Sequence, residues 1–241
     1  ETVYLFLFGI SILASFIDSI AGGGGLLTTP SMLLVGINPL TVLGTNKFQS
    51  SFSTFTSSRN YYTNGYLTDI HRNKYFILSF IGSSAGTLMV SRLSDEILRT
   101  LIPILLITVA VFFIINRQVK TDLSNYIVLL TPLIFLIGFY DGFFGPGTGS
   151  FFVMLFLVFK NQSLLESTAT SKLLNFASNF AAFIIFAVQG FVMWELGLIM
   201  AVGGIGGAYL GSKSAIKVGD KLIRPILVVV SIMLSIRILT S

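Results

Sequence analysis

The chain has 241 residues, of which 54% are hydrophobic and 10% are charged, and its mean hydropathy is +0.87. A soluble domain carries about 25% charged residues, so this composition excludes an ordinary soluble protein and indicates an integral membrane protein. The net charge of +5 does not indicate a nucleic-acid partner, because the lysines and arginines lie at the ends of apolar segments. Cysteine is absent and His71 is the single histidine, which argues against disulfides and against a cysteine–histidine metal site. We therefore expect no cofactor.

Eight apolar windows are long enough to cross a hydrocarbon core, which takes roughly 20 residues each. They are 2–20, 40–62, 74–92, 97–115, 125–144, 163–188, 195–212 and 220–239. None has the alternating pattern of a barrel strand, so the predicted fold class is all-α: a polytopic membrane protein with about eight transmembrane helices. No cleavable signal peptide follows Glu1, and we expect the spans themselves to direct insertion.

Four consecutive glycines, Gly22–Gly25, follow the first window and its aspartate, Asp18. The next apolar run, 26–36, covers only about half of a core of about 30 Å at about 1.5 Å per residue, so a broken or re-entrant segment is predicted. Glycines expose backbone N–H groups, and the N-terminus of the helix that follows attracts anions. The alternative is that the glycines only let two helices pack closely. We expect Gly24 to need a positive φ, which would exclude a β-branched residue there.

A lysine lies inside the second window, in the motif Thr45-Asn46-Lys47. Asn38 and Pro39 form a good N-cap and first turn, and at about 1.5 Å per residue Lys47 lies about 13 Å further along the helix, near the bilayer midplane. Intramembrane charges are usually functional, and Ser50 and Thr54 continue the same polar face. The alternative is that the lysine side chain extends to the interface from a short helix.

The sequence repeats itself. FIDSIAGGGGLLTTPSMLLV, from Phe16, returns as FYDGFFGPGTGSFFVMLFLV, from Phe139, so that Asp18 matches Asp141. Further matched features are the lysine motif, which returns as Thr170-Ser171-Lys172, the polar face, which returns as Asn175 and Asn179, and the spacing Gly82–Gly86, which returns as Gly203–Gly207 and predicts close helix packing. Ser163 and Glu166 form a predicted capping box ahead of Lys172. The predicted division is a first repeat over 1–116, a linker over 117–124 and a second repeat over 125–241.

Four spans in each repeat would return the chain to its starting side, so the two halves are predicted to run parallel. If the short runs after the glycines cross the membrane as well, each repeat has five crossings and the halves are inverted. Basic residues occur in loops on both predicted sides of the membrane, so the positive-inside rule does not decide the orientation.

The glycine loops and the lysine motifs together predict an interior site for an anion. The aspartates have two interpretations, a carboxylate that couples transport to protons or a group that caps the loop. The predicted substrate-binding residues are Lys47, Lys172, Asn46, Ser171, Thr45, Thr170, Gly23, Gly24, Gly25, Gly147, Thr148, Gly149, Ser50 and Asn175, with Asp18 and Asp141 in the coupling or capping role.

These motifs resemble the TauE/SafE family, the sulfite-exporter-like or TSUP permeases. The resemblance lies in the block D-x-x-A-G-G-G-G-x-L-x-T-x-P, the motifs G-T-N-K and A-T-S-K, and the block G-x-x-x-G-A-x-x-G, and it covers essentially the whole chain. The second loop, Gly-Pro-Gly-Thr-Gly at 145–149, departs from the commoner plain glycine run. The resemblance implies a multi-pass carrier in the inner (plasma) membrane for sulfite, sulfoacetate or other sulfonates.

The resulting prediction is a secondary transporter that binds a small sulfur-containing anion between the two repeats and exports it, with a proton or another ion as a possible partner. The alternative is an anion channel that uses the same electropositive loops. An intramembrane enzyme lacks support, because no nucleophile–base pair and no metal-ligand cluster is present in the sequence. Substrate, direction of transport, coupling ion and oligomeric state are left open.

Overall fold

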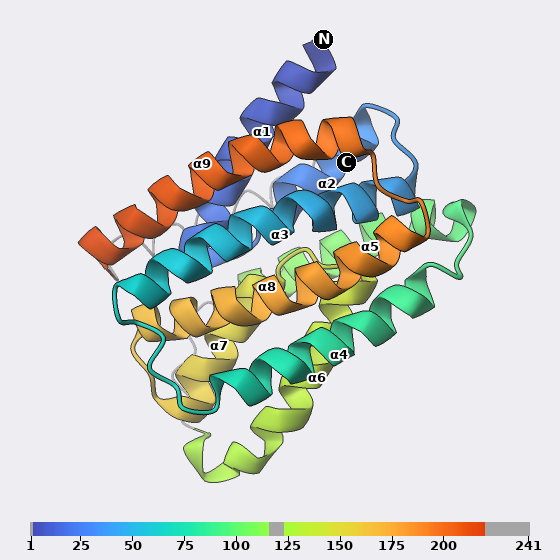
Figure 1. Cartoon of the computed structure of the whole chain (residues 1–241). Helices are drawn as coiled ribbons and strands as arrows, with labels where there is room; N and C mark the ends of the chain where they lie inside the picture. The colour runs from blue at the N-terminus through green and yellow to red at the C-terminus, as the bar shows by residue number, and fades with distance from the viewer. Residues whose placement is uncertain (1, 116–122, 220–241) are drawn as a thin grey trace.

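The computed structural model describes residues 2–115 and 123–219, and 84% of the structure is helical, with no strand in the described part. The chain forms a bundle of tilted helices (Figure 1). Its elements are α1 (Thr2–Ala21), α2 (Gly25–Leu34), α3 (Pro39–Thr63), α4 (Arg72–Val90), α5 (Asp95–Ile115), the 3-10 turn η1 (Ser124–Leu129), α6 (Leu130–Phe143), α7 (Thr148–Lys160), α8 (Leu164–Val188) and α9 (Trp194–Val218). The all-α prediction is confirmed.

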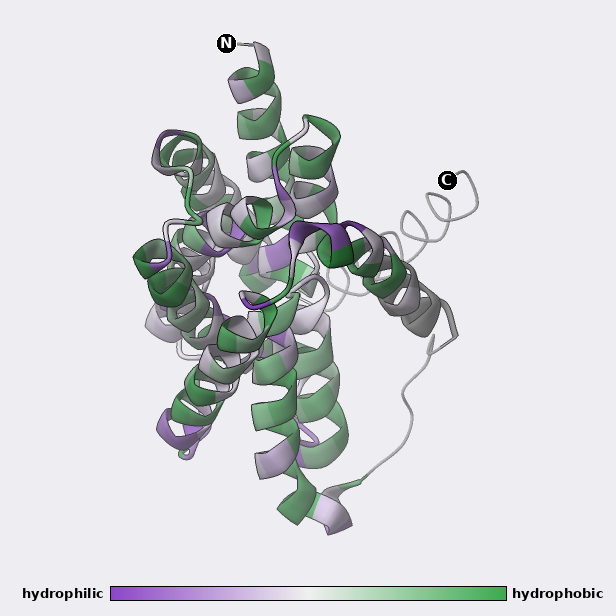
Figure 2. Ribbon diagram, turned by 90° about the vertical axis from the view of Figure 1, so that its right-hand side faces the viewer, coloured by the Kyte–Doolittle hydropathy of each residue, from purple (hydrophilic) through white to green (hydrophobic). Residues whose placement is uncertain are grey.

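Hydrophobic residues recur along all the helices drawn in Figure 2. In the described part, four segments are long and apolar enough to cross a membrane: Thr2–Ala21, Ser124–Phe143, Leu164–Val188 and Trp194–Val218. The chain is therefore consistent with a polytopic membrane protein, and four of the eight predicted spans are supported. The predicted window 220–239 and most of the predicted linker lie outside the described residues.

Glycines let two pairs of helices pack backbone to backbone. On α9, a methyl group at Gly207 would lie 2.1 Å from the carbonyl oxygen of Ile12 in α1. On α4, a methyl group at Gly86 would lie 2.0 Å from the carbonyl oxygen of Phe139 in α6. Both approaches cross from one half of the chain to the other, and the packing role predicted for the two glycine spacings is confirmed.

The first helix of the chain runs in the same direction as α9. Gly203 packs against Ser11, and Gly211, two turns further along α9, packs against Ser19. Helix α3 runs in this direction too, because Phe48 contacts Gly197 and Asn60 Nδ2 donates to Ser212 Oγ at 2.9 Å. Helices α1, α3 and α9 are therefore parallel.

Helices α4, α6 and α8 form a second parallel set. Hydrogen bonds from Ser79 to the carbonyl of Leu174 (2.8 Å) and from Ser83 to that of Ser178 (2.6 Å) align α4 with α8. The backbone of α6 follows α4 in the same sense, since Gly138 packs on Ser79 and Gly142 packs on Ser83.

The two sets of helices run in opposite directions. Phe48 of α3 lies 4.9 Å from Phe183 of α8 between ring centroids, and Phe55 lies 5.2 Å from Phe176, so the sequence order is reversed. Figure 1 shows α3 and α8 side by side in this antiparallel arrangement. The helices that carry the two lysine motifs are therefore inverted, and the prediction of parallel halves is wrong.

The reason for the inversion is that each glycine loop is the tip of a helical hairpin. Helix α2 turns back along α1, because Met32 near its end shares a core cluster with Leu7 near the start of α1. Helix α7 turns back along α6 in the same way, and the Leu123 N–H donates to the Val158 carbonyl at 3.0 Å. The chain thus returns to the side where each hairpin began, and the short helices do not continue across.

The two lysine helices begin differently. The capping box predicted for α8 is confirmed, because the Glu166 N–H donates to Ser163 Oγ (3.2 Å) and the Ser163 N–H donates to Glu166 Oε2 (3.1 Å). Asn38 occupies the N-cap position of α3, ahead of Pro39, but its side chain makes no capping hydrogen bond. The two caps fix where each helix starts and so the height of the lysine nine residues along.

Candidate functional site

The tips of the two hairpins meet inside the bundle. Ser150 Oγ, in the first turn of α7, donates a hydrogen bond of 2.8 Å to the carbonyl of Ala21, the last residue of α1. Gly22 has a φ of +82°, and a methyl group there would lie 2.4 Å from the Ser150 nitrogen. Both the left-handed backbone and the close approach require glycine at this position.

The expectation of a positive φ at Gly24 is wrong, because this residue is helical, with a φ of −55°. Glycine is required there by space instead: a methyl group would lie 2.8 Å from Asp18 Cβ and 2.9 Å from the Ala14 carbonyl oxygen. The left-handed positions are Gly22 and Gly23 in the first loop and Gly145 and Gly147 in the second. A single sequence does not distinguish these positions within a run of glycines.

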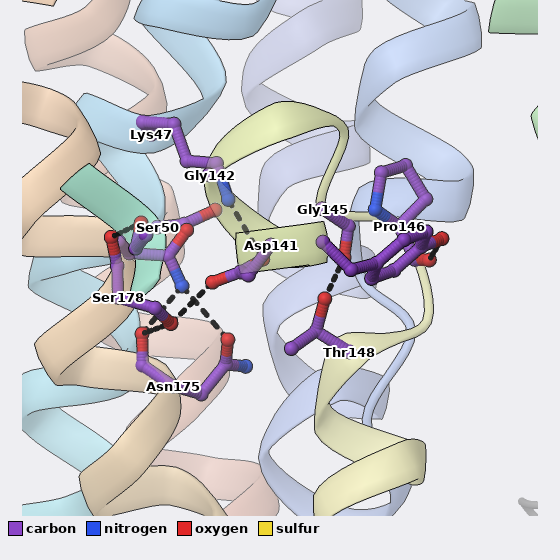
Figure 3. Close-up of polar contacts among 12 residues, drawn as sticks. Lys47, Ser50, Asp141, Gly142, Gly145, Pro146, Thr148, Asn175 and Ser178 are labelled. Atoms are coloured by element: carbon purple, nitrogen blue, oxygen red, sulfur yellow. Dashed lines mark hydrogen bonds and ion pairs between the residues drawn. The ribbon is translucent and has the colours of Figure 1, made fainter. Parts of the chain in front are cut away.

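Each lysine pairs with the aspartate of the other half of the chain. Lys47 Nζ lies 2.7 Å from Asp141 Oδ1, and Lys172 Nζ lies 2.9 Å from Asp18 Oδ2. Figure 3 shows Lys47 reaching from α3 to the carboxylate at the end of α6. Lys47 and Lys172 are 1% and 0% exposed, so neither extends to the surface.

The two aspartates have different second partners. The Gly24 N–H donates to Asp18 Oδ1 at 3.0 Å, so this carboxylate holds its own loop, and its side chain is 15% exposed. Asp141 instead accepts a short hydrogen bond from Ser178 Oγ, and its side chain is 2% exposed (Figure 3). Asp18 is thus the more exposed of the two carboxylates, and Asp141 is the more enclosed.

The residues that precede the lysines hold the surrounding backbone. Thr45 Oγ1 accepts the Met193 N–H at 3.0 Å, and Thr170 Oγ1 donates to the Glu166 carbonyl at 3.0 Å. Ser171 Oγ donates to the Gly149 carbonyl at 2.7 Å and so ties α8 to the tip of the second hairpin. In this structure their hydroxyl groups serve these bonds and do not line the cavity described next.

A cavity of about 20 Å³ lies between the hairpin tips and the two lysine helices. A single water molecule needs about 10–15 Å³ of such space, so the cavity as it stands is smaller than a sulfur oxyanion. It is lined by Ala14, Ser15, Asp18, Gly23, Gly24, Gly25, Asn46, Lys47, Gln49, Ser50, Ser53, Thr54, Asp141, Gly145, Gly147, Thr148, Gly149, Asn175 and Asn179.

Most of the predicted site residues lie in this lining. The exceptions are Thr45, Thr170 and Ser171, with the roles given above, and Lys172, whose ammonium group lies behind Asp18 and beside Gly149. Sequence reasoning missed Ser15, Gln49 and Ser53 as site residues. Their signal is the helical spacing of polar residues, since Ser15 precedes Asp18 by one turn of α1 and Ser53 follows Ser50 by one turn of α3.

The charges around the cavity cancel, since two lysines face two aspartates. Apart from the lysine ammonium groups, the side-chain donors at the cavity are neutral amides and hydroxyls. Asn46 Oδ1 accepts from Thr28 Oγ1 (2.6 Å) and Gln49 Nε2 (3.2 Å), which leaves its amide nitrogen directed toward Gly25. Asn175 is similar, because its Oδ1 accepts from Asn179 at 2.9 Å.

The helix ends add further donors to the same space. The first N–H groups of a helix have no partner within it, and Gly25 and Gly149, in the first turns of α2 and α7, both line the cavity. The cavity therefore lies at the positive ends of two helix dipoles. The described residues contain no group of three or more histidine, cysteine, aspartate or glutamate side chains that could hold a metal ion.

Comparisons with known proteins relate this chain to membrane transporters. The sulfite exporter TauE/SafE family matches residues 7–238. A probable membrane transporter protein, ORF9, of Sinorhizobium sp. is 41% identical over 98% of this chain and 92% of its own length. The probable membrane transporter protein YfcA of Escherichia coli K12 is 37% identical over 97% of this chain and 88% of its own, and a probable membrane transporter protein of Haemophilus influenzae is 36% identical over 95% and 91%. No solved structure matches the chain.

Proposed function

Because the chain belongs to the TauE/SafE family of membrane transporters, we propose that it is a secondary transporter of small sulfur-containing anions such as sulfite, sulfoacetate and other sulfonates. The substrate binds between the two halves, at the meeting point of the hairpin tips, and is exported across the plasma membrane. The family description names a sulfite exporter, and that description supports both the substrate class and the direction.

The observation that carries the proposal is the convergence of two helix N-termini on one cavity in the interior of an apolar bundle. An anion there accepts hydrogen bonds from backbone N–H groups and from the amides of Asn46 and Asn175. Lysine ammonium groups lie within the same cluster, each held by a carboxylate. Oxyanions have several acceptor oxygens. A site made of neutral donors and two paired lysine ammonium groups therefore favours an oxyanion over a cationic ligand.

The inverted arrangement supports transport by alternating access. The two hairpins enter the bundle from opposite sides and meet at their tips, and inverted repeats with broken helices at the substrate site recur in secondary transporters. The cavity has space for about one water molecule, so an anion enters only after the hairpins separate from the lysine helices. A permanently open pore would not need that step, which favours a carrier over a channel.

Flux into proteoliposomes tests the proposal. Purified protein is reconstituted, and uptake of sulfite, sulfoacetate, taurine, thiosulfate and acetate is measured with and without a pH gradient. We expect saturable uptake of the sulfur anions and weak uptake of acetate. Uptake equal to that of empty liposomes for every sulfur anion would contradict the proposal, and electrical currents far above carrier turnover would establish the channel instead.

A further inference from the structure

The two halves of the site differ at one place. On the side of Asp18, the cavity is lined by Ser15 of α1 and Gln49 of α3, both from the first half of the chain, and these two residues face Gly204 of α9, from the second half. The sequence repeat aligns Ser15 and Gln49 with Gly138 and Leu174 of the second half, and it aligns Gly204 with Ser83 of the first half. The polar pair Ser15 and Gln49 therefore corresponds to the apolar pair Gly138 and Leu174.

Three side chains of the first half converge over the bare face of Gly204. A methyl group at Gly204 would lie 3.1 Å from Gln49 Oε1, 3.2 Å from Ser15 Oγ and 3.4 Å from Ser53 Cβ. These contacts are all with side chains, whereas a methyl group at neighbouring Gly203 or Gly207 would meet the backbone of α1. Gly204 thus lies directly against side chains of the site, and a methyl group there would crowd Gln49 Oε1 and Ser15 Oγ.

Gln49 brings an unused acceptor to this space. Its Nε2 donates to Asn46 Oδ1 at 3.2 Å and to Ser50 Oγ at 2.9 Å, which fixes the orientation of the amide. Its Oε1 is buried and has no hydrogen-bond partner among the described residues. Buried acceptors are normally satisfied, and leaving one unpaired costs about 1–3 kcal/mol. Gln49 is 2% exposed and lines the cavity, so a ligand in the cavity can satisfy this oxygen.

The corresponding place in the second half is closed. A methyl group at Gly138 would lie 2.6 Å from the Ser79 carbonyl oxygen, so the helices are in backbone contact there. Ser83, the counterpart of Gly204, donates its hydroxyl hydrogen bond to the Ser178 carbonyl at 2.6 Å. Leu174, the counterpart of Gln49, has no side-chain acceptor, so a ligand that satisfies Gln49 Oε1 is itself asymmetric.

We propose that Ser15, Gln49 and Ser53 form a subsite over Gly204 that accepts a hydrogen bond from the end of the substrate opposite its anionic group. The assignment rests on the proposed function. It specifies the preferred substrate class as sulfonates whose carbon chain ends in a hydroxyl or ammonium group. The sulfonate lies at the hairpin tips, and the donor at the other end reaches Gln49 Oε1.

The test compares two sulfonates of nearly equal size, 2-hydroxyethanesulfonate and ethanesulfonate, in proteoliposome uptake. An unpaired buried acceptor costs about 1–3 kcal/mol, so the wild type should prefer the hydroxylated compound about tenfold. Gly204→Ala fills the subsite, and Gln49→Leu installs the residue of the second half. In both variants the preference should fall to about twofold or less. Gly206→Ala is the matched control, because a methyl group there has nothing within 4 Å, and it should keep the wild-type preference.

Uptake is divided by the amount of folded protein, determined from thermal unfolding of each preparation. Equal uptake of the two sulfonates by the wild type, or a preference that survives in both Gly204→Ala and Gln49→Leu, would overturn the subsite while leaving the proposed function standing. A wild type that moves sulfite but neither sulfonate would overturn it as well. A wild type that moves no sulfur anion would overturn the proposed function, and the subsite with it.

Discussion

Lys47 of the first half of the chain lies 2.7 Å from Asp141 of the second, and both side chains are buried. The same relationship holds in reverse between Lys172 and Asp18, at 2.9 Å. Each glycine hairpin is therefore held to the lysine helix of the other half. An anion that binds a lysine has to compete with the carboxylate already there, so substrate binding and the contact between the halves are linked.

The first prediction concerns the stability that the Lys47–Asp141 pair provides. Asp141→Asn leaves the Lys47 ammonium buried without a counter-charge, and breaking a buried pair in this way costs about 3–5 kcal/mol. Thermal unfolding in detergent should show a large loss of stability for this variant.

The double variant Lys47→Met with Asp141→Asn is the control for this pair. It removes both charges, so it should be more stable than Asp141→Asn alone. The coupling energy between the two substitutions should be at least about 0.5 kcal/mol. Additive effects of the two substitutions would mean that the ion pair does not hold the halves together.

A second prediction separates the close approach of the hairpin tips from backbone strain. Gly22 and Gly36 have almost the same φ, +82° and +85°, but a methyl group at Gly22 would meet Ser150, whereas one at Gly36 has nothing within 4 Å. Gly36→Ala should therefore show the cost of the left-handed backbone alone, of order 1 kcal/mol. Gly22→Ala should lose more stability than that and most of the uptake. Similar behaviour of the two variants would show that the tips do not need to touch.

The helix caps of the two lysine helices provide a third prediction. Ser163→Ala removes a complete capping box and should cost about 1 kcal/mol of stability. Asn38→Ala should cost less, because the Asn38 side chain makes no capping bond to α3 and its Oδ1 only accepts a 3.4 Å hydrogen bond from Arg99. Chemical or thermal unfolding of both variants measures the difference, and a larger loss for Asn38→Ala would contradict the capping assignment.

The sequence was sufficient for the local features of the fold and of the site. Glycine runs, proline, capping residues and apolar windows act over a few residues, and the breaks between α1 and α2 and between α6 and α7 follow from them. The direction of the halves did not follow, because it depends on whether α2 returns the chain to its starting side. That return is set by contacts such as the one between Leu7 and Met32, which are distant in sequence.

The pairing of charges was also beyond the sequence. The repeat allows each aspartate to pair with the lysine of its own half or with that of the other half, and in the structure Asp18 binds Lys172 and Asp141 binds Lys47. The exchange results from the inverted packing of α3 against α8. Gln49 was missed for a related reason, since its unpaired oxygen faces Gly204 of the last described helix.

A fourth prediction concerns proton coupling, for which Asp18 is the better placed of the two carboxylates. Its side chain is 15% exposed and lines the cavity, whereas that of Asp141 is 2% exposed and held by Ser178 as well as Lys47. A protonated Asp18 would release Lys172 for the substrate. In Asp18→Asn we expect uptake driven by a pH gradient to be lost while substrate exchange survives.

The measurement for Asp18 is gradient-driven uptake beside exchange flux in the same liposomes. If both activities fall together, Asp18 serves only to hold its loop through the Gly24 N–H and to pair with Lys172. Full gradient-driven uptake in Asp18→Asn would remove this carboxylate from the coupling mechanism.

Sulfite uptake by Lys172→Met, beside wild type and Lys213→Met, tests most directly whether the anion binds at the hairpin tips. Lys172 is 0% exposed at the site, whereas Lys213 lies on the exposed face of α9, so the two substitutions remove the same charge from different environments. At equal amounts of folded protein, we predict at least a tenfold lower uptake for Lys172→Met and an unchanged uptake for Lys213→Met. Equal uptake by Lys172→Met and wild type would contradict the account.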